Sequence, residues 1–520
     1  MSNDTVPRGV SPERPLELDP ARALRADHTP YGVVDIGSNS VRLVVYNELS
    51  RAPFPRFNEK SLCGLGAGLD RTGELSDDAM AHTVQAVHRF CIIASAMGVQ
   101  RLDVIATEAV RRATNGQDLV RAIKDRTGRD IRILSGVEEA RYATLGVISG
   151  FYRPKGLVGD MGGGSLEVAE VLDDTTGERS VSLPLGALPV MALLAKAGDE
   201  ARRRIDEILK GQLPPLLTRP VFYAVGGGWR ALARAHMETV DAPLKVAHGY
   251  DVDAGELRAF AKSVWRMAPD KVAALPGVAS RRAETLPAAA LVMDRVLKNL
   301  RPERVVFSAL GLREGWLYSQ LPPEQQYRDP LVEGAQAFGL PRARVPGFGP
   351  ALARWTETLF PDETADERRL RLAACALSDI AWADHVDVKA QQSFRRMEHF
   401  PFIGLTHTER VFIAATLHAR YGGKPDDPCL QPSISLLSTG ARRRTQILGR
   451  AMQLGHRFSG SVPEILDTAT LRITTDCVRL EIAASSEDVP DSDAVQARMK
   501  QLAKALGVPR TEFAAADGGR

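Results

Sequence analysis

Two turns rich in glycine and hydroxyl side chains recur at a fixed spacing in this chain. The segment Asp35-Ile-Gly-Ser-Asn-Ser40 aligns without a gap to Asp160-Met-Gly-Gly-Gly-Ser165 when the chain is shifted by 125 residues. An apolar stretch precedes each turn and a strand-like stretch follows it, so each reads as a strand, a tight turn and a second strand. An internal repeat of this kind predicts two structurally related halves.

Strands and helices alternate around these turns, which predicts an α/β protein. Ser76 is a suitable N-cap for a helix that ends before Gly98, and the helix from Glu138 starts with acidic residues, as the helix dipole favours. A third glycine turn follows a strand in 221–230. The remaining expected elements are a hairpin over 31–46, strands over 102–106 and 131–134, a helix over 118–126, and a strand, turn and helix start over 305–316.

The length of 520 residues suggests about three domains. The texture changes near 320–330, after which the pattern is mostly helical, with one strand-like alternation over 471–482. Acids and prolines at the N-terminus are unlike a secretory signal and favour a disordered tail. We therefore predict a tail over 1–28, a first half over 29–150, a second half over 151–320 and a C-terminal domain over 321–520.

Composition excludes several classes of protein. Hydrophobic residues make up 44% and charged residues 25% of the chain, as in an ordinary globular protein. The longest apolar stretch, 181–195, is interrupted by Pro184, Gly186 and Pro189, so we expect no membrane span. The five cysteines are scattered without a Cys-x-x-Cys pair, which argues against disulfides and zinc and favours the cytoplasm.

The paired turns suit the binding of a chain of phosphates. Glycine lets backbone N–H groups approach anionic oxygens, and hydroxyl and amide side chains add donors. Asp35 and Asp160 would hold a Mg2+ ion that bridges phosphate oxygens, with Glu167 helping to position the metal or water. Either turn alone is equally consistent with an ordinary hairpin. The predicted phosphate-binding residues are Gly37, Ser38, Asn39, Ser40, Gly162, Gly163, Gly164 and Ser165.

Five segments resemble motifs of the exopolyphosphatase and guanosine pentaphosphate phosphatase family. They are VVDIGSNSVRLVVYN, ATEAVRRATN, ILSGVEEARYATLGV, VGDMGGGSLEVAEV and ALGLREGWLY. The likeness covers 30–320 well and the rest weakly. It implies the fold of the actin, Hsp70 and sugar-kinase superfamily, an α/β fold with two ribonuclease H-like halves around a phosphate cleft. A mostly helical, HD-like C-terminal domain would follow.

The resemblance also implies the reaction, which is hydrolysis of a terminal phosphoanhydride by water with Mg2+ present, or alternatively Mn2+. The family's catalytic base falls on Glu139, and Arg111 would neutralise charge on the transferred phosphoryl group. The alternative for Glu138 and Glu139 is that they are first-turn acids that only stabilise a helix. Similarly, the alternative for one of the two arginines, Arg111 or its neighbour Arg112, is that it is only a solvated surface residue.

The substrate implied is inorganic polyphosphate, with guanosine pentaphosphate or tetraphosphate as the alternative ligand. Superfamily members contact adenosine at the turn that corresponds to Gly226–Gly228, but Trp229 replaces a small polar residue there. The alternative to a substrate contact at this turn is that Trp229 packs in the core. A sugar or acid kinase would need an aspartate base and a fuller adenosine motif. A non-catalytic alarmone sensor would have no need for Glu139, Asp160 and Glu167 together.

The C-terminal region resembles an HD-type domain, but Ser378 replaces its histidine. His385, His399, His407 and His418 lack HD spacing and read as surface or helix-cap residues, so we expect no second metal site.

A stretch from Ser435 to Ser459 has basic residues and no acid, and is either a path for polyphosphate or a solvated helix face. It lacks interleaved aromatics, which argues against nucleic acid. The five arginines of this basic stretch are Arg442, Arg443, Arg444, Arg450 and Arg457. The family resemblance also implies a homodimer.

Overall fold

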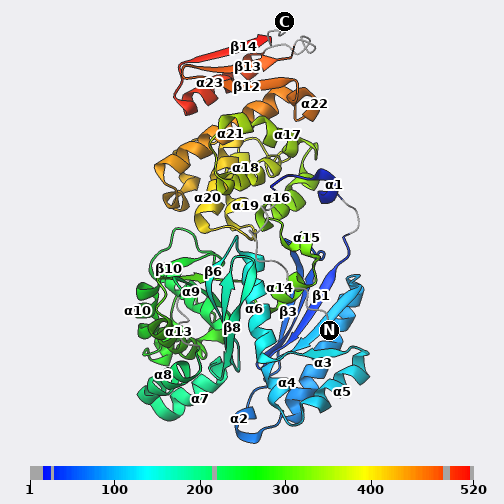
Figure 1. Ribbon diagram of the computed structural model, residues 1–520, viewed down its shortest axis with the longest axis vertical. Coiled ribbons are helices and arrows are strands. Elements are labelled where there is room, and N and C mark those ends of the chain that lie inside the picture. The colour runs from blue at the N-terminus through cyan, green and yellow to red at the C-terminus, as the bar shows by residue number, and fades with distance from the viewer. Residues whose placement is uncertain (1–15, 25–27, 214–218, 484–491, 516–520) are drawn as a thin grey trace.

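The computed structural model describes residues 16–24, 28–213, 219–483 and 492–515. Two α/β lobes lie side by side, and a mostly helical domain is stacked on one end of the pair, with a small sheet at its far tip (Figure 1). Within the described residues, no helix is both long and apolar enough to cross a membrane. The expected α/β class and helical C-terminal domain are confirmed.

The first lobe is built on a five-stranded sheet in the order β3-β2-β1-β4-β5. Its central strand β1 pairs antiparallel with β2 and parallel with β4. Ser76 caps α3 as expected, by accepting the N–H of Ala79. The elements are β1 Tyr31–Ile36, β2 Ser40–Tyr46, β3 Pro55–Leu62, α2 Leu69–Thr72, α3 Asp77–Ala96, β4 Arg101–Ala106, α4 Glu108–Arg112, α5 Gly116–Thr127, β5 Ile131–Ile133 and α6 Gly136–Gly150.

The second lobe repeats this topology. Its sheet has the order β10-β11-β9-β6-β7-β8, so β8-β7-β6-β9-β11 corresponds to β3-β2-β1-β4-β5. The elements are β6 Lys155–Met161, β7 Leu166–Leu172, β8 Thr175–Leu183, α7 Ala187–Ala197, α8 Ala201–Gln212, β9 Val221–Val225, α9 Gly227–Thr239, β10 Asp251–Asp253, α10 Ala254–Val264, α11 Pro269–Ala273, α12 Ser280–Ala283, α13 Leu286–Leu300, β11 Arg304–Phe307 and α14 Leu312–Ser319.

The two repeated turns have the same local geometry. The N–H of Gly37 donates to the carbonyl of Ser40 at 3.0 Å, and the N–H of Gly162 donates to the carbonyl of Ser165 at 2.9 Å. Each turn therefore connects a central strand to its antiparallel neighbour in the same register. The internal repeat inferred from the sequence is thus a structural repeat.

Helices α6 and α14 pack against each other between the lobes (Figure 1). A Cβ on Gly146 would lie 2.2 Å from the carbonyl oxygen of Gly311, and one on Gly315 would lie 1.7 Å from that of Tyr142. Only glycine fits at such positions, because the two backbones touch there. This contact brings the N-terminal end of α14 next to the glycine turns of the two lobes.

The C-terminal domain begins after α14 and has its own apolar core. The strand-like alternation over 471–482 is confirmed as β structure, and the segment contains two strands because 474–476 form a turn between them. They join β14 in a three-stranded sheet. The elements are α15 Pro323–Gln326, α16 Pro330–Gly339, α17 Phe348–Trp355, α18 Ala365–Ala376, α19 Lys389–His399, α20 His407–Arg420, α21 Thr439–Ser459, α22 Pro463–Leu466, β12 Ala469–Ile473, β13 Cys477–Ile482, α23 Asp493–Leu506 and β14 Arg510–Ala515.

The expectation of a disordered tail over 1–28 is wrong for its described part near α1 (Pro20–Ala23). Asp19 caps this helix, and Arg22 donates to Glu333 of α16 at 2.5 Å. Burial of Ala23 in the C-terminal core explains why the segment is ordered. Residues 1–15 and 25–27 lie outside the described part of the chain.

Two expectations for the C-terminal domain need correction. His418 is not a surface residue, since only 1% of it is exposed and its Nε2 lies 3.1 Å from Asp427. The arginines of the basic stretch lie on α21, and most of them are engaged within the domain. Arg443 donates to the carbonyl of Leu506, Arg450 to that of Gly423, and Arg444 to Glu363. These contacts favour the interpretation of the basic stretch as a helix face rather than as a path for polyphosphate.

The position of the missing HD histidine is filled by a buried polar cluster. Ser378 hydrogen-bonds His456 at 3.1 Å, and Arg344 donates to both carboxylate oxygens of Asp379 at 2.8 and 2.9 Å. No group of three potential metal ligands occurs in the described ranges. The guanidinium of Arg344 therefore takes the role of counter-ion to Asp379.

Candidate active site

The two glycine turns of the repeat face each other across the lobes. A Cβ on Gly163 would lie 3.1 Å from Cβ of Ser38 and 3.5 Å from the backbone nitrogen of Asn39. Ser38 and Ser165 are each 5% exposed. The structure therefore brings together the residues predicted to bind phosphate, namely Gly37, Ser38, Asn39, Ser40, Gly162, Gly163, Gly164 and Ser165.

Glu108 lies between the turns and was not predicted from the sequence. It is 6% exposed, accepts the hydroxyl of Ser38 at 3.0 Å and forms an ion pair with Arg112. A Cβ on Gly164 would lie 1.9 Å from Oε2 of Glu108, so glycine is required there. Arg112 is therefore not a mere surface arginine, because it balances a buried carboxylate of the site. The signal was present in the segment ATEAVRRATN.

Three carboxylates predicted as metal ligands lie at the ends of the central strands. Asp160 and Glu167 are cross-strand partners on β6 and β7, and Ser182 donates to Glu167 at 2.7 Å. Burial raises the pKa of Asp160 to about 6 and raises that of Glu167 well above its ordinary value, with the charge of Glu139 adding to the second shift. Asp35, the third, accepts from Arg313 at 2.8 Å.

This donor set fits a hard divalent cation in part. Buried carboxylates with raised pKa values gain from a nearby cation, and carboxylate oxygens are the ligands that Mg2+ prefers. The described side chains nevertheless form no cluster of three potential ligands. Mg2+ is commonly held by one or two carboxylates, with water and substrate phosphates completing the shell. Asp35 and Asp160 satisfy that requirement, with Arg313 donating to one carboxylate oxygen of Asp35 and Ser182 donating to one of Glu167.

Glu139 and Arg111 form an ion pair at the N-terminal end of α6. Arg111 also donates to the carbonyl of Leu134, which fixes the guanidinium between β5 and α6. Glu139 is 6% exposed, and burial raises its pKa to about 7 although Arg111 opposes the shift. A carboxylate with such a pKa can accept a proton near neutral pH.

Glu138 stabilises the N-terminal end of α6, which is the structural role considered as an alternative for Glu138 and Glu139. Ser135 caps α6, and the carboxylate of Glu138 accepts the N–H of Ser135 at 2.9 Å, which completes a capping box. Arg132 donates to Glu138 at 2.8 Å. These hydrogen bonds, with that from the Ser135 backbone the largest, lower the pKa of Glu138 to about 2. Its side chain is therefore committed to the helix end.

Helix α14 contributes two charged residues that sequence reasoning missed. Arg313 bridges to Asp35 of the first lobe. Glu314 accepts the hydroxyl of Tyr46 at 2.7 Å and the N–H of Gly311 at 3.0 Å. Both residues lie in the segment ALGLREGWLY, where charged side chains within an otherwise apolar run were the available signal. They tie the start of α14 to the first lobe.

Cations from both lobes border the site without ion-pair partners among the described residues. Lys60 and Arg42 are cross-strand neighbours on β3 and β2, and Arg281 and Arg282 belong to α12. Burial, together with the charges of Arg282, Arg42 and Arg281, lowers the pKa of Lys60 to about 8. Arg230 of α9 donates only to the carbonyl of Ala309. Such a set of unpaired like charges favours an anionic ligand.

The third glycine turn is followed by a buried tryptophan and lies against an arginine side chain. Trp229 is fully buried, and its Nε1 donates to the carbonyl of Ala289 at 3.0 Å. A Cβ on Gly227 would lie 2.5 Å from the guanidinium of Arg282. The interpretation of Trp229 as a core residue is therefore confirmed, and an arginine covers the turn.

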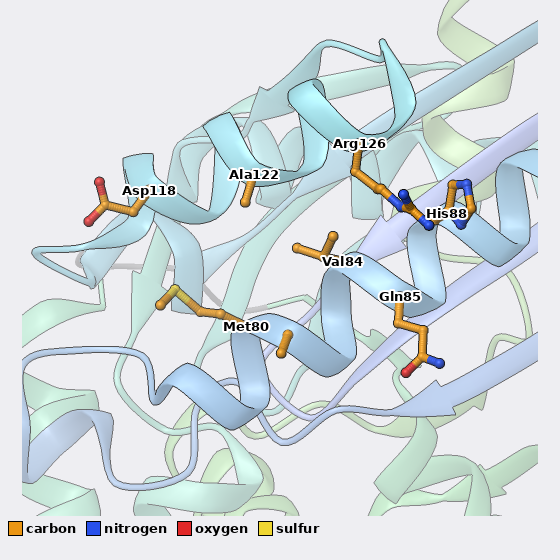
Figure 2. Close-up of a pocket in the computed structure, with 8 residues that line it drawn as sticks. Met80, Val84, Gln85, His88, Asp118, Ala122 and Arg126 are labelled. Atoms are coloured by element: carbon orange, nitrogen blue, oxygen red, sulfur yellow. The ribbon is translucent and has the colours of Figure 1, made fainter.

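A pocket of about 470 Å³ lies elsewhere, on the outer side of the first lobe. Met80, Val84 and His88 of α3 face Asp118 and Arg126 of α5 across it (Figure 2). None of the predicted site residues lines it. It is therefore not the site that contains Glu139.

Comparison with known proteins agrees with this geometry. The model of the Ppx/GppA phosphatase family matches residues 44–324. This chain is a member of that family. A second family model, described as exopolyphosphatase, C-terminal, matches residues 331–513. Membership makes the chain an enzyme, a phosphoanhydride hydrolase.

The similar proteins each cover part of this chain. Exopolyphosphatase 1 of Mycobacterium tuberculosis is 30% identical over 306 residues, which are 56% of this chain and 88% of that protein. Retrograde regulation protein 2 of Saccharomyces cerevisiae is 26% identical over 439 residues, 75% of this chain and 72% of that protein. The crystal structure of an exopolyphosphatase from Cytophaga hutchinsonii is 23% identical, with a TM-score of 0.51, over 56% of this chain and 97% of that one. The structural likeness supports the two-lobe fold.

Proposed function

We propose that this family member is an exopolyphosphatase that removes orthophosphate from the end of inorganic polyphosphate. The observation that carries the proposal is the buried Glu139–Arg111 pair beside two facing glycine turns. The backbone N–H groups of the turns, with Ser38 and Ser165, bind the oxygens of the terminal phosphate.

In the proposed reaction a water molecule lies between Glu139 and the terminal phosphorus. Its oxygen attacks phosphorus, its proton passes to the Glu139 carboxylate, and the bridging P–O bond breaks, so that the bonding electrons leave with the shortened chain. Arg111 orients Glu139 and offsets the negative charge that develops on the phosphoryl oxygens. Asp35 and Asp160 would hold Mg2+, or alternatively Mn2+, which would supply positive charge to the substrate phosphates when bound.

The preference for polyphosphate over guanosine pentaphosphate rests on the surroundings of the site. Lys60, Arg42, Arg281 and Arg282 offer charge to several phosphates in succession. In contrast, Arg282 covers the Gly227 turn and Trp229 is buried, so no aromatic surface for a guanine base is evident among these residues. A linear polyanion uses all of these cations, whereas a nucleoside gains from few of them.

The test measures orthophosphate release from long-chain polyphosphate and from guanosine pentaphosphate in parallel, with Mg2+, for the native protein and Glu139→Gln. Faster release from polyphosphate, lost in the variant while polyphosphate still binds, supports the proposal. Faster release from guanosine pentaphosphate would reassign the substrate. Tight binding of either compound without release would favour an alarmone or phosphate sensor.

The family resemblance further leads us to propose a homodimer that works in the cytoplasm without nucleic acid or membrane partners. Light scattering on the purified full chain measures the oligomeric state directly. A monomer at micromolar concentration would contradict the dimer.

A further inference from the structure

The C-terminal end of α6 is bound by three separate parts of the chain. The last carbonyls of a helix have no partner within the helix and need one elsewhere. Arg51 donates to the carbonyls of Ile148 and Ser149 at 3.3 and 2.8 Å. The carbonyl of Gly150 accepts the N–H of Gly404 at 2.8 Å and Nε2 of His248 at 3.2 Å. The helix end is therefore held by the first lobe, the second lobe and the C-terminal domain together.

Arg51 is the contribution of the first lobe, from the segment between β2 and β3. It is 2% exposed. Besides α6, its Nε donates to the carbonyls of Gln326 and Arg328, in the segment that leads into the C-terminal domain, at 3.2 and 3.1 Å. One guanidinium thus binds four backbone carbonyls and joins α6 to the domain linker.

His248 supplies the second lobe's contact in a defined tautomer. Its Nδ1 accepts the N–H of Ala309 at 3.3 Å, so the ring proton lies on Nε2, which donates to Gly150. The ring also packs on Phe151, with centroids 4.7 Å apart. Burial keeps the pKa of His248 low, at about 3, so this contact does not depend on protonation near neutral pH.

Gly404 is the contact from the C-terminal domain, in the loop between α19 and α20. Its φ of +74° requires glycine, and a Cβ there would lie 2.4 Å from Pro330. Arg369 of α18 is fully buried, donates to the carbonyl of Gly404 and forms an ion pair with Asp329 at 2.6 Å. The loop that grips α6 is therefore anchored in the core of its own domain.

We propose that the C-terminal domain positions the catalytic carboxylate through α6, with Arg51 and Arg369 as the positioning residues. Glu139 lies near the start of this helix and the clamp acts on its last turn, eleven residues later, or about 16 Å along the axis. A helix is stiff over this length, so a clamp on one end fixes the axial position of the other. The inference rests on the proposed role of Glu139 in the reaction.

The clamp adds to the packing along the side of α6. There the helix meets α14 at the glycine positions, and Tyr142 lies against Trp316 with ring centroids 5.1 Å apart. The clamp is the set of contacts that holds the last turn, so its loss removes part of the restraint on the axial position of α6. A displacement of about 1 Å at the reacting groups can cost on the order of a hundredfold in rate. Loss of the clamp should lower kcat more than it raises KM, because substrate phosphates bind mainly to the glycine turns.

The experiment compares Arg369→Met with Arg371→Met. Both arginines lie on α18 and are at most 2% exposed, but Arg371 donates to the carbonyl of Ala353 and to Glu363 and does not touch the Gly404 loop. We expect Arg369→Met to lower kcat about tenfold with KM changed less than about threefold. Both variants are assayed at a temperature at which melting curves show them to be folded. Under that condition Arg371→Met should keep kcat within about twofold.

Arg51→Lys provides a second, milder test from the first lobe, since lysine keeps the charge but cannot bind four carbonyls at once. Hydrogen exchange of the α6 amides is the readout that does not depend on activity. We expect faster exchange in 147–151 for Arg51→Lys and Arg369→Met only. Equal effects of Arg369→Met and Arg371→Met on kcat and exchange, or none, would overturn the proposal. If exchange responds as expected while Glu139→Gln remains active, the clamp stands and the proposed base does not.

Discussion

Arg111 and Glu139 form a buried ion pair that connects the helix following β4 to the helix following β5. The arginine also holds the carbonyl of Leu134, so the pair lies at the edge of the first sheet, where its strands end. Breaking a buried pair leaves an uncompensated charge. Substitution of either Arg111 or Glu139 should therefore be costly. The neighbouring Glu138 is not part of this pair and interacts with Arg132 instead.

Substitution Glu139→Gln should lower kcat by about a thousandfold, because the amide cannot accept a proton from water. The matched control is Glu138→Gln, which keeps a hydrogen-bonding capping box and loses only the exposed pairing with Arg132, worth about 0.5 kcal/mol of stability. Orthophosphate release and thermal melting of both variants make the comparison. Equal activity losses would assign the effect to the helix end rather than to the base.

The pH dependence of kcat/KM should follow Glu139. Its pKa is raised to about 7, so the basic form is lost, and activity falls, as the pH drops through that value. Folding stability changes in the opposite direction. An acid with a raised folded-state pKa binds protons more tightly when folded, so this group adds stability as the pH falls from about 7 towards 4.5. Activity that falls with pH while the melting temperature falls in parallel would contradict this assignment.

Gly164→Ala should impair the enzyme by at least about tenfold, since the new Cβ would meet the Glu108 carboxylate at 1.9 Å and displace it or the turn. Gly211→Ala is the control, because no described residue lies within 4 Å of its Cβ position on α8, and alanine should add up to about 1 kcal/mol of stability there. Rates and unfolding midpoints are measured for both. An active Gly164→Ala enzyme would mean that Glu108 moves freely.

Removal of charge with Lys60→Ala and Arg281→Ala should raise KM for long-chain polyphosphate by about tenfold and leave that for tripolyphosphate nearly unchanged. The slope of log KM against log salt concentration should also decrease, because fewer counterions are displaced. The charge-matched control is Lys500→Ala with Lys504→Ala on α23, at the far end of the molecule (Figure 1). A similar rise in KM for both chain lengths would place these cations at the terminal phosphate instead.

Chelation of divalent cations should abolish orthophosphate release, and added Mg2+ or Mn2+ should restore it. Asp160→Asn should raise the Mg2+ concentration needed for half-maximal activity by about tenfold or more, because an amide is a weaker ligand than a carboxylate. Titration of activity against Mg2+ measures this. Unchanged Mg2+ dependence in Asp160→Asn would remove this residue from the proposed metal site.

The repeated turns and most secondary elements were predictable because they depend on local chemistry. Ser76 and Ser135 cap helices through their own hydroxyls, and the strand–turn–strand units around Asp35 and Asp160 form from neighbouring residues. The alternation over 471–482 indicates β structure but not the number of strands, because the alternating pattern continues through the turn at 474–476. A period of two cannot distinguish a hairpin from a long strand when the turn is short.

Long-range partners account for the residues that were missed. Glu108 and Ser38 are 70 residues apart, and Arg313 and Asp35 are 278 apart, so neither pair produces a local pattern. The basic stretch on α21 illustrates the reverse case. It contains no acid of its own, yet Glu363 from a distant segment pairs with Arg444. Charge counted along a sequence therefore overestimates the charge that a folded surface presents to a ligand.

The glycine contacts between α6 and α14 have an implication for how this enzyme can evolve. Glu139 and Arg313 belong to different halves of the repeat, but their helices meet backbone to backbone at Gly146 and Gly315. Any larger residue at that crossing would push both helices apart and move a proton acceptor and the counter-ion of Asp35 in the same step. The two halves thus share one unit of geometry, and a substitution at this crossing would disturb the site from both sides at once.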